Sequence, residues 1–265
     1  MNILHVFSDY NFIVILSLII LAFTAGFIDA VVGGGGLIQI PALLINLPDI
    51  PLPTIFGTNK IVALSGTSIS AYQYSKRIKL DYRILLFISI SAAIASYSGA
   101  KIVSRINVSF LKPAILIILI LILIYSLIKK DLGKVKTKSL SINRQIIYGS
   151  IIGILVGFYD GFFGPGTGSF LVLAFVVILG FEFLEASAYS KVINCVTNIS
   201  ALVVFIRQGN YLIELAILMA IFNILGSILG TKLAIKKGNH FIRIIFMLIV
   251  SILIVRYAWD IYGNH

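Results

Sequence analysis

The chain has 265 residues, of which 59% are hydrophobic and only 12% are charged, and its mean hydropathy is +1.06. A soluble domain carries about twice this charged fraction, so the composition excludes a water-soluble fold and makes lipid the expected solvent. The net charge of +11 does not indicate nucleic-acid binding, because most cations lie in short gaps between apolar runs, where they orient a membrane protein.

Long apolar runs follow one another along the chain, and most approach the ~20 residues that cross the hydrocarbon core as a helix. In chain order they lie at 12–32, 37–47, 54–74, 84–104, 110–128, 145–163, 168–181, 185–206, 212–234 and 241–261. They predict an all-α polytopic membrane protein. The runs at 37–47 and 168–181 are too short for a simple crossing, and each follows a glycine-rich break. We therefore expect broken or re-entrant helices there.

The most polar stretch, 129–144, contains six cations and predicts a cytoplasmic basic linker between two membrane halves, 1–128 and 145–265. The halves match at a fixed offset of 131 residues. At this offset aspartates, lysines and glycines coincide: Asp29 with Asp160, Lys60 with Lys191, Gly26 with Gly157, Gly33 with Gly164, Gly35 with Gly166 and Gly99 with Gly230. We interpret the match as a duplication of five hydrophobic segments.

The loop charges predict how the halves are oriented. The basic loops 75–83 and 235–243 belong inside with the linker, whereas 46–53 has no Lys or Arg and belongs outside. An odd number of crossings per half satisfies these assignments and inverts the second half, as in many secondary transporters. Because cations flank the loop 104–109, which this scheme places outside, a parallel repeat with four crossings per half is the alternative. The total of eight or ten crossings stays open.

Two glycine-rich breaks, 29–36 and 160–168, give the strongest functional signal. Four consecutive glycines end the helix in the first break, and Pro165 removes a backbone donor in the second. The helix that follows each break begins with free N–H groups and a positive dipole end, which suit an anion. Close helix packing is the alternative role of such glycines. The expected anion contacts are Gly34, Gly35, Gly36, Gly166, Thr167 and Gly168.

Lys60 and Lys191 lie inside apolar runs, where a charge costs about 2.5–3.5 kcal/mol on insertion scales. Their equivalent positions in the two halves favour substrate binding over snorkelling to the membrane surface. Asp29 and Asp160, beside the breaks, are expected to balance charge or carry protons. Neutral donors, whose alternative role is interhelical hydrogen bonding, complete the predicted substrate site: Asn59, Thr67, Asn194 and Asn198.

Metal and cofactor chemistry finds little support in the sequence. Cys195 is the only cysteine, and the three histidines lie near the termini or in a basic loop. Cysteine clusters and histidine ligation of zinc or haem inside the apolar runs are therefore excluded. We expect no metal, no cofactor and no enzymatic activity. The expected partners are a small anionic substrate and the lipid bilayer, not nucleic acid, and a homo-oligomer stays open.

The sequence resembles the TauE/SafE family of sulfite and organosulfur-anion exporters. The resemblance rests on residues 26–36, 57–60, 157–168, 190–198 and 226–230, and it extends over most of the chain. It implies a permease of a bacterial-type plasma membrane that moves sulfite or organosulfonates. The membrane potential would favour export of an anion, because moving one negative charge out of a cell with a negative interior releases about 2.3 kcal/mol per 100 mV.

Two other functions stay open on the sequence. A cation- or proton-coupled transporter of another small metabolite would use Asp29 and Asp160 as ligands. A non-transporting membrane subunit or an intramembrane enzyme is the other class, although the chain offers neither a histidine cluster nor a Ser/His/Asp set for catalysis.

Overall fold

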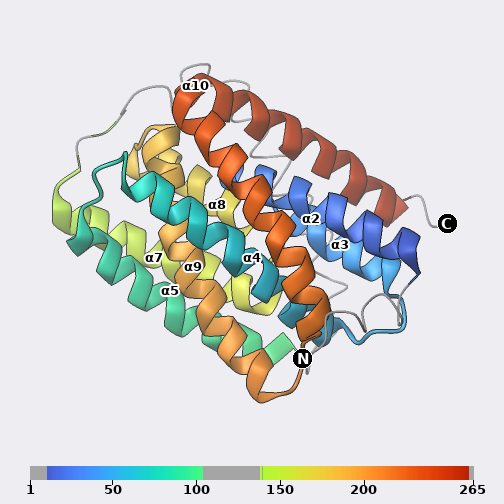
Figure 1. The fold of residues 1–265 in the computed structure, drawn as a ribbon. Coiled ribbons are helices and arrows are strands. Elements are labelled where there is room, and N and C mark those ends of the chain that lie inside the picture. Colours follow the sequence, from blue (N-terminus) through green and yellow to red (C-terminus); the bar gives the residue numbers. More distant parts are fainter. Residues whose placement is uncertain (1–10, 104–137, 139, 263–265) are drawn as a thin grey trace.

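The computed structural model describes residues 11–103, 138 and 140–262, and these residues form a bundle of helices (Figure 1). Among the described residues, five helices are long and apolar enough to cross a membrane: α2 (Phe12–Val32), α5 (Tyr82–Val103), α7 (Ile142–Phe162), α9 (Phe183–Arg207) and the first part of α10 (Ile213–Tyr262). The predicted polytopic helical protein is thereby confirmed. The predicted run at 110–128 and most of the linker 129–144 lie outside the described residues.

Large apolar side chains on the outer faces of the bundle explain why lipid is the solvent. Ile13, Ile94 and Leu155 are 72%, 65% and 67% exposed. Side chains of this kind are spread over several helices, and a water-soluble monomer rarely exposes so much contiguous apolar surface. The bundle therefore presents a hydrocarbon-compatible exterior.

A short apolar helix follows each glycine-rich break. α2 ends at Val32, and α3 (Gly36–Asn46) begins after the first break. α7 is followed by α8 (Thr167–Ala174), which continues into the π-helical turn η2 (Phe175–Leu179). Gly33 and Gly166 have φ of 82° and 84°, a left-handed conformation that glycine adopts without steric penalty. The helices are thus broken where the sequence predicts.

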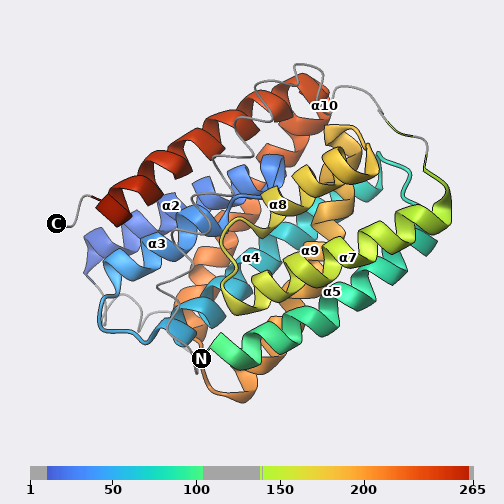
Figure 2. The same cartoon turned by 180° about the vertical axis from the view of Figure 1, so that it is seen from behind.

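α4 (Leu52–Ser75) and α9 pack against each other inside the bundle and run in opposite directions (Figures 1 and 2). A hydrogen bond joins the start of each helix to the loop that follows the other. The Leu212 N–H donates to Thr58 Oγ1 at 2.9 Å, and the Asp81 N–H donates to the Tyr189 hydroxyl at 2.7 Å. The 131-residue offset relates Thr58 to Tyr189 and Asp81 to Leu212, so the two bonds occupy equivalent places in the two halves.

The remaining long helices pack across the halves. α10 lies along α4 and α2, whereas α5 lies along α9 and α7. Glycines permit both approaches, because a Cβ on Gly99 would overlap the backbone of Phe158 and a Cβ on Gly230 would overlap that of Phe27. These two contacts are again related by the offset. The first long helix of each half is therefore covered by a helix of the other half.

The predicted loop at 235–243 is wrong in extent, because α10 runs through this region and only Gly238 departs from helical geometry, with φ 69° and ψ −162°. This conformation is open to glycine and strongly disfavoured for other residues. The parts of α10 before and after Gly238 form two arms that turn back on each other (Figure 1). A single glycine therefore replaces the expected loop.

Candidate functional site

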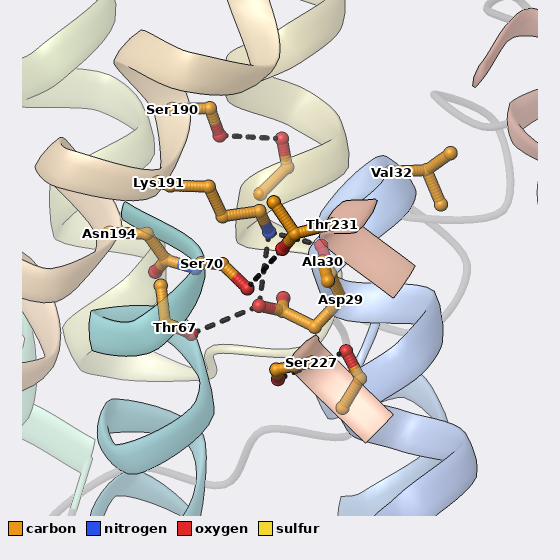
Figure 3. Close-up of polar contacts among 12 residues, drawn as sticks. Asp29, Ala30, Val32, Thr67, Ser70, Ser190, Lys191, Asn194, Ser227 and Thr231 are labelled. Carbon is orange, nitrogen blue, oxygen red and sulfur yellow. Dashed lines mark hydrogen bonds and ion pairs between the residues drawn. The ribbon is translucent and has the colours of Figure 1, made fainter. Parts of the chain in front are cut away.

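Asp29 of α2 and Lys191 of α9 form a buried ion pair (Figure 3). Lys191 Nζ lies 3.0 Å from Asp29 Oδ2 and also donates to the Asp29 backbone carbonyl. Thr67 Oγ1 of α4 donates to the same Oδ2 at 2.9 Å. The Lys191 and Asp29 side chains are 0% and 11% exposed, so the carboxylate rather than water neutralises the ammonium.

Lys60 of α4 and Asp160 of α7 form a second buried pair. Lys60 Nζ lies 2.6 Å from Asp160 Oδ2, although without the alignment of a hydrogen bond. Thr167 Oγ1, in the first turn of α8, donates to Asp160 Oδ1 at 2.7 Å and lies 2.8 Å from the Gly164 carbonyl oxygen. Both sites thus consist of one lysine, one aspartate and one threonine.

Each ion pair joins the two halves of the chain. Asp29 and Lys191 become Asp160 and Lys60 when the 131-residue offset exchanges the halves, so each pair is the counterpart of the other. Removing one partner of a buried pair leaves an uncompensated charge, which costs about 3–5 kcal/mol. The two pairs therefore hold the halves together at equivalent points.

The two glycine-rich breaks touch each other. The Ser169 N–H donates to the Gly33 carbonyl at 3.1 Å, and Ser169 Oγ donates to the Val32 carbonyl at 2.9 Å. A Cβ on Gly33 would overlap the backbone of Gly168. The end of α2 and the start of α8 consequently approach backbone to backbone, which only glycine permits.

The same breaks border both ion pairs. A Cβ on Gly35 would lie 2.7 Å from Asp29 Cβ, and a Cβ on Gly164 would lie 3.6 Å from Lys60 Nζ. Ser190 Oγ, next to Lys191 in the chain, donates to the Gly168 carbonyl at 3.1 Å. The structure therefore brings the predicted glycines and the predicted charged residues into one buried region.

The other predicted glycines make first-turn contacts. Gly34 accepts from the Leu37 N–H at 3.1 Å, and Gly166 accepts from the Phe170 N–H at 3.1 Å. A Cβ on Gly36 would lie 3.3 Å from Pro165 Cα, so the start of α3 packs on the second break. The predicted glycines thus form the first turns of the two short helices and the contact between the breaks.

The predicted amides are all buried. Asn194 lies one helical turn after Lys191 (Figure 3). Its Oδ1 is 3.4 Å from Thr197 Oγ1. Asn59 precedes Lys60 in α4, and its Oδ1 has no hydrogen-bond partner among the described residues. Asn198 is buried on the same face of α9 as Asn194. Neutral hydrogen-bonding groups therefore accompany both lysines.

Several polar contacts at this site were not expected from the sequence. The Tyr74 hydroxyl donates to the Ala30 carbonyl at 3.1 Å, next to Asp29. Thr231 Oγ1 of α10 donates to Ser70 Oγ at 3.0 Å, and Ser227 Oγ donates to the Gly26 carbonyl at 3.2 Å. The sequence gives one signal for these contacts: the 131-residue offset relates Ser227 to Ser96. Within the described residues, no group of three or more His, Cys, Asp or Glu side chains could hold a metal ion.

The comparisons with known proteins agree with a membrane transporter. A family model described as "Sulfite exporter TauE/SafE" matches residues 18–257. A "Probable membrane transporter protein" of Haemophilus influenzae is 34% identical over 90% of this chain and 92% of its own length. A Sinorhizobium protein of the same description is 35% identical over 96% and 95%, and one from Escherichia coli K12 is 34% identical over 93% and 90%. No solved structure matches the chain.

Proposed function

Because this chain belongs to the TauE/SafE sulfite exporter family, we propose that it moves small oxyanions, most simply sulfite or an organosulfonate, across a bacterial inner membrane by secondary transport. One observation carries the proposal: two lysines, each neutralised by an aspartate of the other half, lie buried beside the glycine-rich breaks. An intramembrane ionisable residue at such a place is a functional candidate by default.

The ion pairs suggest how an anion is bound and released. Each lysine already has a carboxylate partner, so a substrate anion competes with Asp29 for Lys191 and with Asp160 for Lys60. Protonation of the aspartate removes this competition and frees the ammonium. Thr67 and Thr167, which now donate to the carboxylates, then donate to the substrate oxyanion. The aspartates thus couple anion binding to proton uptake.

We also propose that the two halves form an inverted repeat. The antiparallel α4 and α9, the equivalent hydrogen bonds at their ends and the exchanged ion pairs support it. Alternating access in inverted repeats moves one group of helices against another around a central site. The cross-half ion pairs would break and re-form in that motion.

The proposed cytoplasmic side is the end of the bundle where basic side chains gather. Lys76, Arg77, Lys232 and Lys236 line one groove there, and Lys79 lines a neighbouring one. Positively charged loops favour the cytoplasm, so this end would face inward together with the linker 129–144.

Anion flux in reconstituted vesicles tests the proposal. Purified protein should accelerate sulfite or methanesulfonate efflux down the concentration gradient of the anion. Lys60→Ala and Lys191→Ala should each abolish the protein-dependent flux, whereas Lys101→Ala, at an exposed site on α5, should leave it intact. Normal flux in both buried-lysine variants would show that the site assignment is wrong.

The same assay separates the proposal from a cation transporter. Asp29→Asn and Asp160→Asn remove the carboxylates but leave each ammonium in place. If the aspartates are cation ligands, these variants lose cation-coupled flux and gain no anion affinity. If they compete with the substrate, anion binding persists and its dependence on pH is lost.

A further inference from the structure

A groove lined by cations lies between the end of α4 and the middle of α10. Its volume is about 460 Å³, and Lys76, Arg77, Lys232 and Lys236 line it with no acidic residue among them. Lys76 Nζ lies 4.2 Å from the centroid of the Tyr72 ring, which holds this cation at the rim. Arg77 also borders a groove that contains Glu182 and Glu185, so the three lysines carry most of the excess charge.

A buried pair of hydroxyls lies directly beneath the groove. Ser70 precedes the groove residue Gln73 by about one helical turn, and Thr231 precedes the groove residues Lys232 and Ile235 on α10. Thr231 Oγ1 donates to Ser70 Oγ at 3.0 Å, and both residues are fully buried. This hydrogen bond links α4 and α10 at the inner end of the groove (Figure 3).

One helical turn further into the bundle, a threonine hydroxyl contacts the Asp29–Lys191 ion pair. Thr67, one turn before Ser70 on α4, donates to Asp29 Oδ2 at 2.9 Å. Ser227, one turn before Thr231 on α10, donates to the Gly26 carbonyl at 3.2 Å. Polar side chains therefore follow one another from the inner end of the groove to Asp29 and Lys191, and Figure 3 shows the part from Ser70 and Thr231 inward.

The other half keeps polar residues at the deeper level, Asn198 and Ser96, but lacks the two hydroxyls next to the groove. The residues that the 131-residue offset relates to Ser70 and Thr231 are Ala201 and Ala100, and both are fully buried. Alanine therefore satisfies the packing at these places in the fold, while a buried hydroxyl carries a desolvation cost. The serine and threonine are not explained by packing, and they occur only beside the pair that lies under the cationic groove.

We propose that the groove is a receiving site for small oxyanions and that the Ser70–Thr231 hydrogen bond closes the route from it to the Asp29–Lys191 pair. The inference rests on the proposed function and adds an entrance on the cytoplasmic side. A groove lined by cations raises the local anion concentration and the association rate. The two hydroxyls, once separated, donate to the passing oxyanion in place of water.

Thiol labelling tests the route without measuring transport. In a Cys195→Ser background, single cysteines replace Ser70 or Thr231, and the matched controls replace Ala201 or Ala100. Gln73→Cys, at the half-buried groove wall, reports that the reagent reaches the groove. The probe is the anionic sulfonatoethyl methanethiosulfonate. It is applied to the cytoplasmic face in inside-out vesicles for positions 70 and 231, and to the outer face in right-side-out vesicles for positions 201 and 100, because the proposed inverted repeat places these controls toward the opposite side. We expect S70C and T231C to react several-fold faster than A201C and A100C.

Charge preference tests the receiving site. At T231C the anionic reagent should react about tenfold faster than its trimethylammonium analogue once each rate is divided by that reagent's rate with a free thiol in solution, because the groove concentrates anions. Lys76→Gln, Lys232→Gln and Lys236→Gln combined should abolish this preference. Lys101→Gln combined with Arg207→Gln, two exposed cations at the opposite end of the bundle, should leave it unchanged.

Three outcomes overturn the inference. Equal labelling at the Ser70 and Ala201 positions removes the one-sided route, and equal rates for the two reagents, each relative to its rate with a free thiol, remove the anion site. If T231C is protected from labelling in vesicles that contain phosphatidylglycerol, and free methanesulfonate does not protect it, the groove holds a lipid headgroup instead. These results do not depend on flux, so a protein that moves no sulfite but labels as expected would contradict the proposed function and leave the route standing.

Discussion

Lys60 Nζ lies 2.6 Å from Asp160 Oδ2, and this contact ties α4 of the first half to α7 of the second. Its counterpart ties Lys191 of the second half to Asp29 of the first. A motion that separates the halves at one pair would expose two charges to hydrocarbon unless a proton or an anion compensates them. Under the proposed function, occupancy by an anion or a proton is therefore a condition for the rearrangement.

A double-mutant cycle should reveal the coupling of Lys60 and Asp160. Lys60→Gln or Asp160→Asn alone should lower the free energy of unfolding by about 3–5 kcal/mol, because each leaves one buried charge without its partner. The double variant should lose much less than the sum of the two. Unfolding by denaturing detergent, followed by circular dichroism, measures all three values.

Lys101→Gln is the control for that cycle, since its ammonium is exposed and should contribute little to the free energy of unfolding. Additive losses in the double variant would contradict a coupled pair at this site.

Anion binding should increase when Asp29 is neutralised. Asp29→Asn keeps a hydrogen-bonding side chain but removes the charge that competes for Lys191. Methanesulfonate should therefore raise the melting temperature of this variant at lower concentration than that of the unsubstituted protein. Lys191→Gln should abolish the response. A lower apparent affinity in Asp29→Asn would mean that the carboxylate supports anion binding instead of competing with it.

Much of the helical layout follows from the sequence because hydropathy and glycine act locally. The apolar run at 12–32 coincides with α2, and the breaks fall at the glycines of 33–35 and at 163–166. The error at 235–243 has the same local cause: the cations there suggest a loop, but Gly238 alone accommodates the turn and its neighbours remain helical.

The sequence predicts less of the site because its contacts depend on packing between distant helices. The offset of 131 marks Asp29, Asp160, Lys60 and Lys191 as special residues but leaves open which aspartate meets which lysine. The Thr231–Ser70 bond joins residues that lie far apart in the chain and has no counterpart in the other half. Repeat symmetry therefore cannot reveal it.

The orientation of the halves can be tested at one pair of related positions. Arg77 and Gln208 are both exposed, follow α4 and α9 respectively, and are related by the 131-residue offset. In a Cys195→Ser background, a cysteine at position 77 should react with an impermeant maleimide only from the cytoplasmic side. A cysteine at position 208 should react only from the outside.

Labelling of both cysteines from the same side would establish a parallel repeat in place of an inverted one. A cysteine in place of Lys237, which lies next to the turn in α10, provides the internal reference, because it should behave like position 77.

Contact between the two glycine-rich breaks predicts a large difference between two glycine-to-alanine substitutions. Gly33 and Gly209 both have positive φ, 82° and 71°, so alanine at either position incurs a backbone penalty of about 1–2 kcal/mol. At Gly209 a Cβ meets no atom within 4 Å, whereas at Gly33 it overlaps the backbone of Gly168 and Ser169. Backbone atoms cannot move aside as a flexible side chain can. Gly33→Ala should therefore lower the free energy of unfolding by several kcal/mol more than Gly209→Ala and should also impair anion binding, because the shift displaces α8 from Asp160. Detergent unfolding and the methanesulfonate thermal shift measure the two effects, and equal stability of the two variants would show that the breaks do not touch.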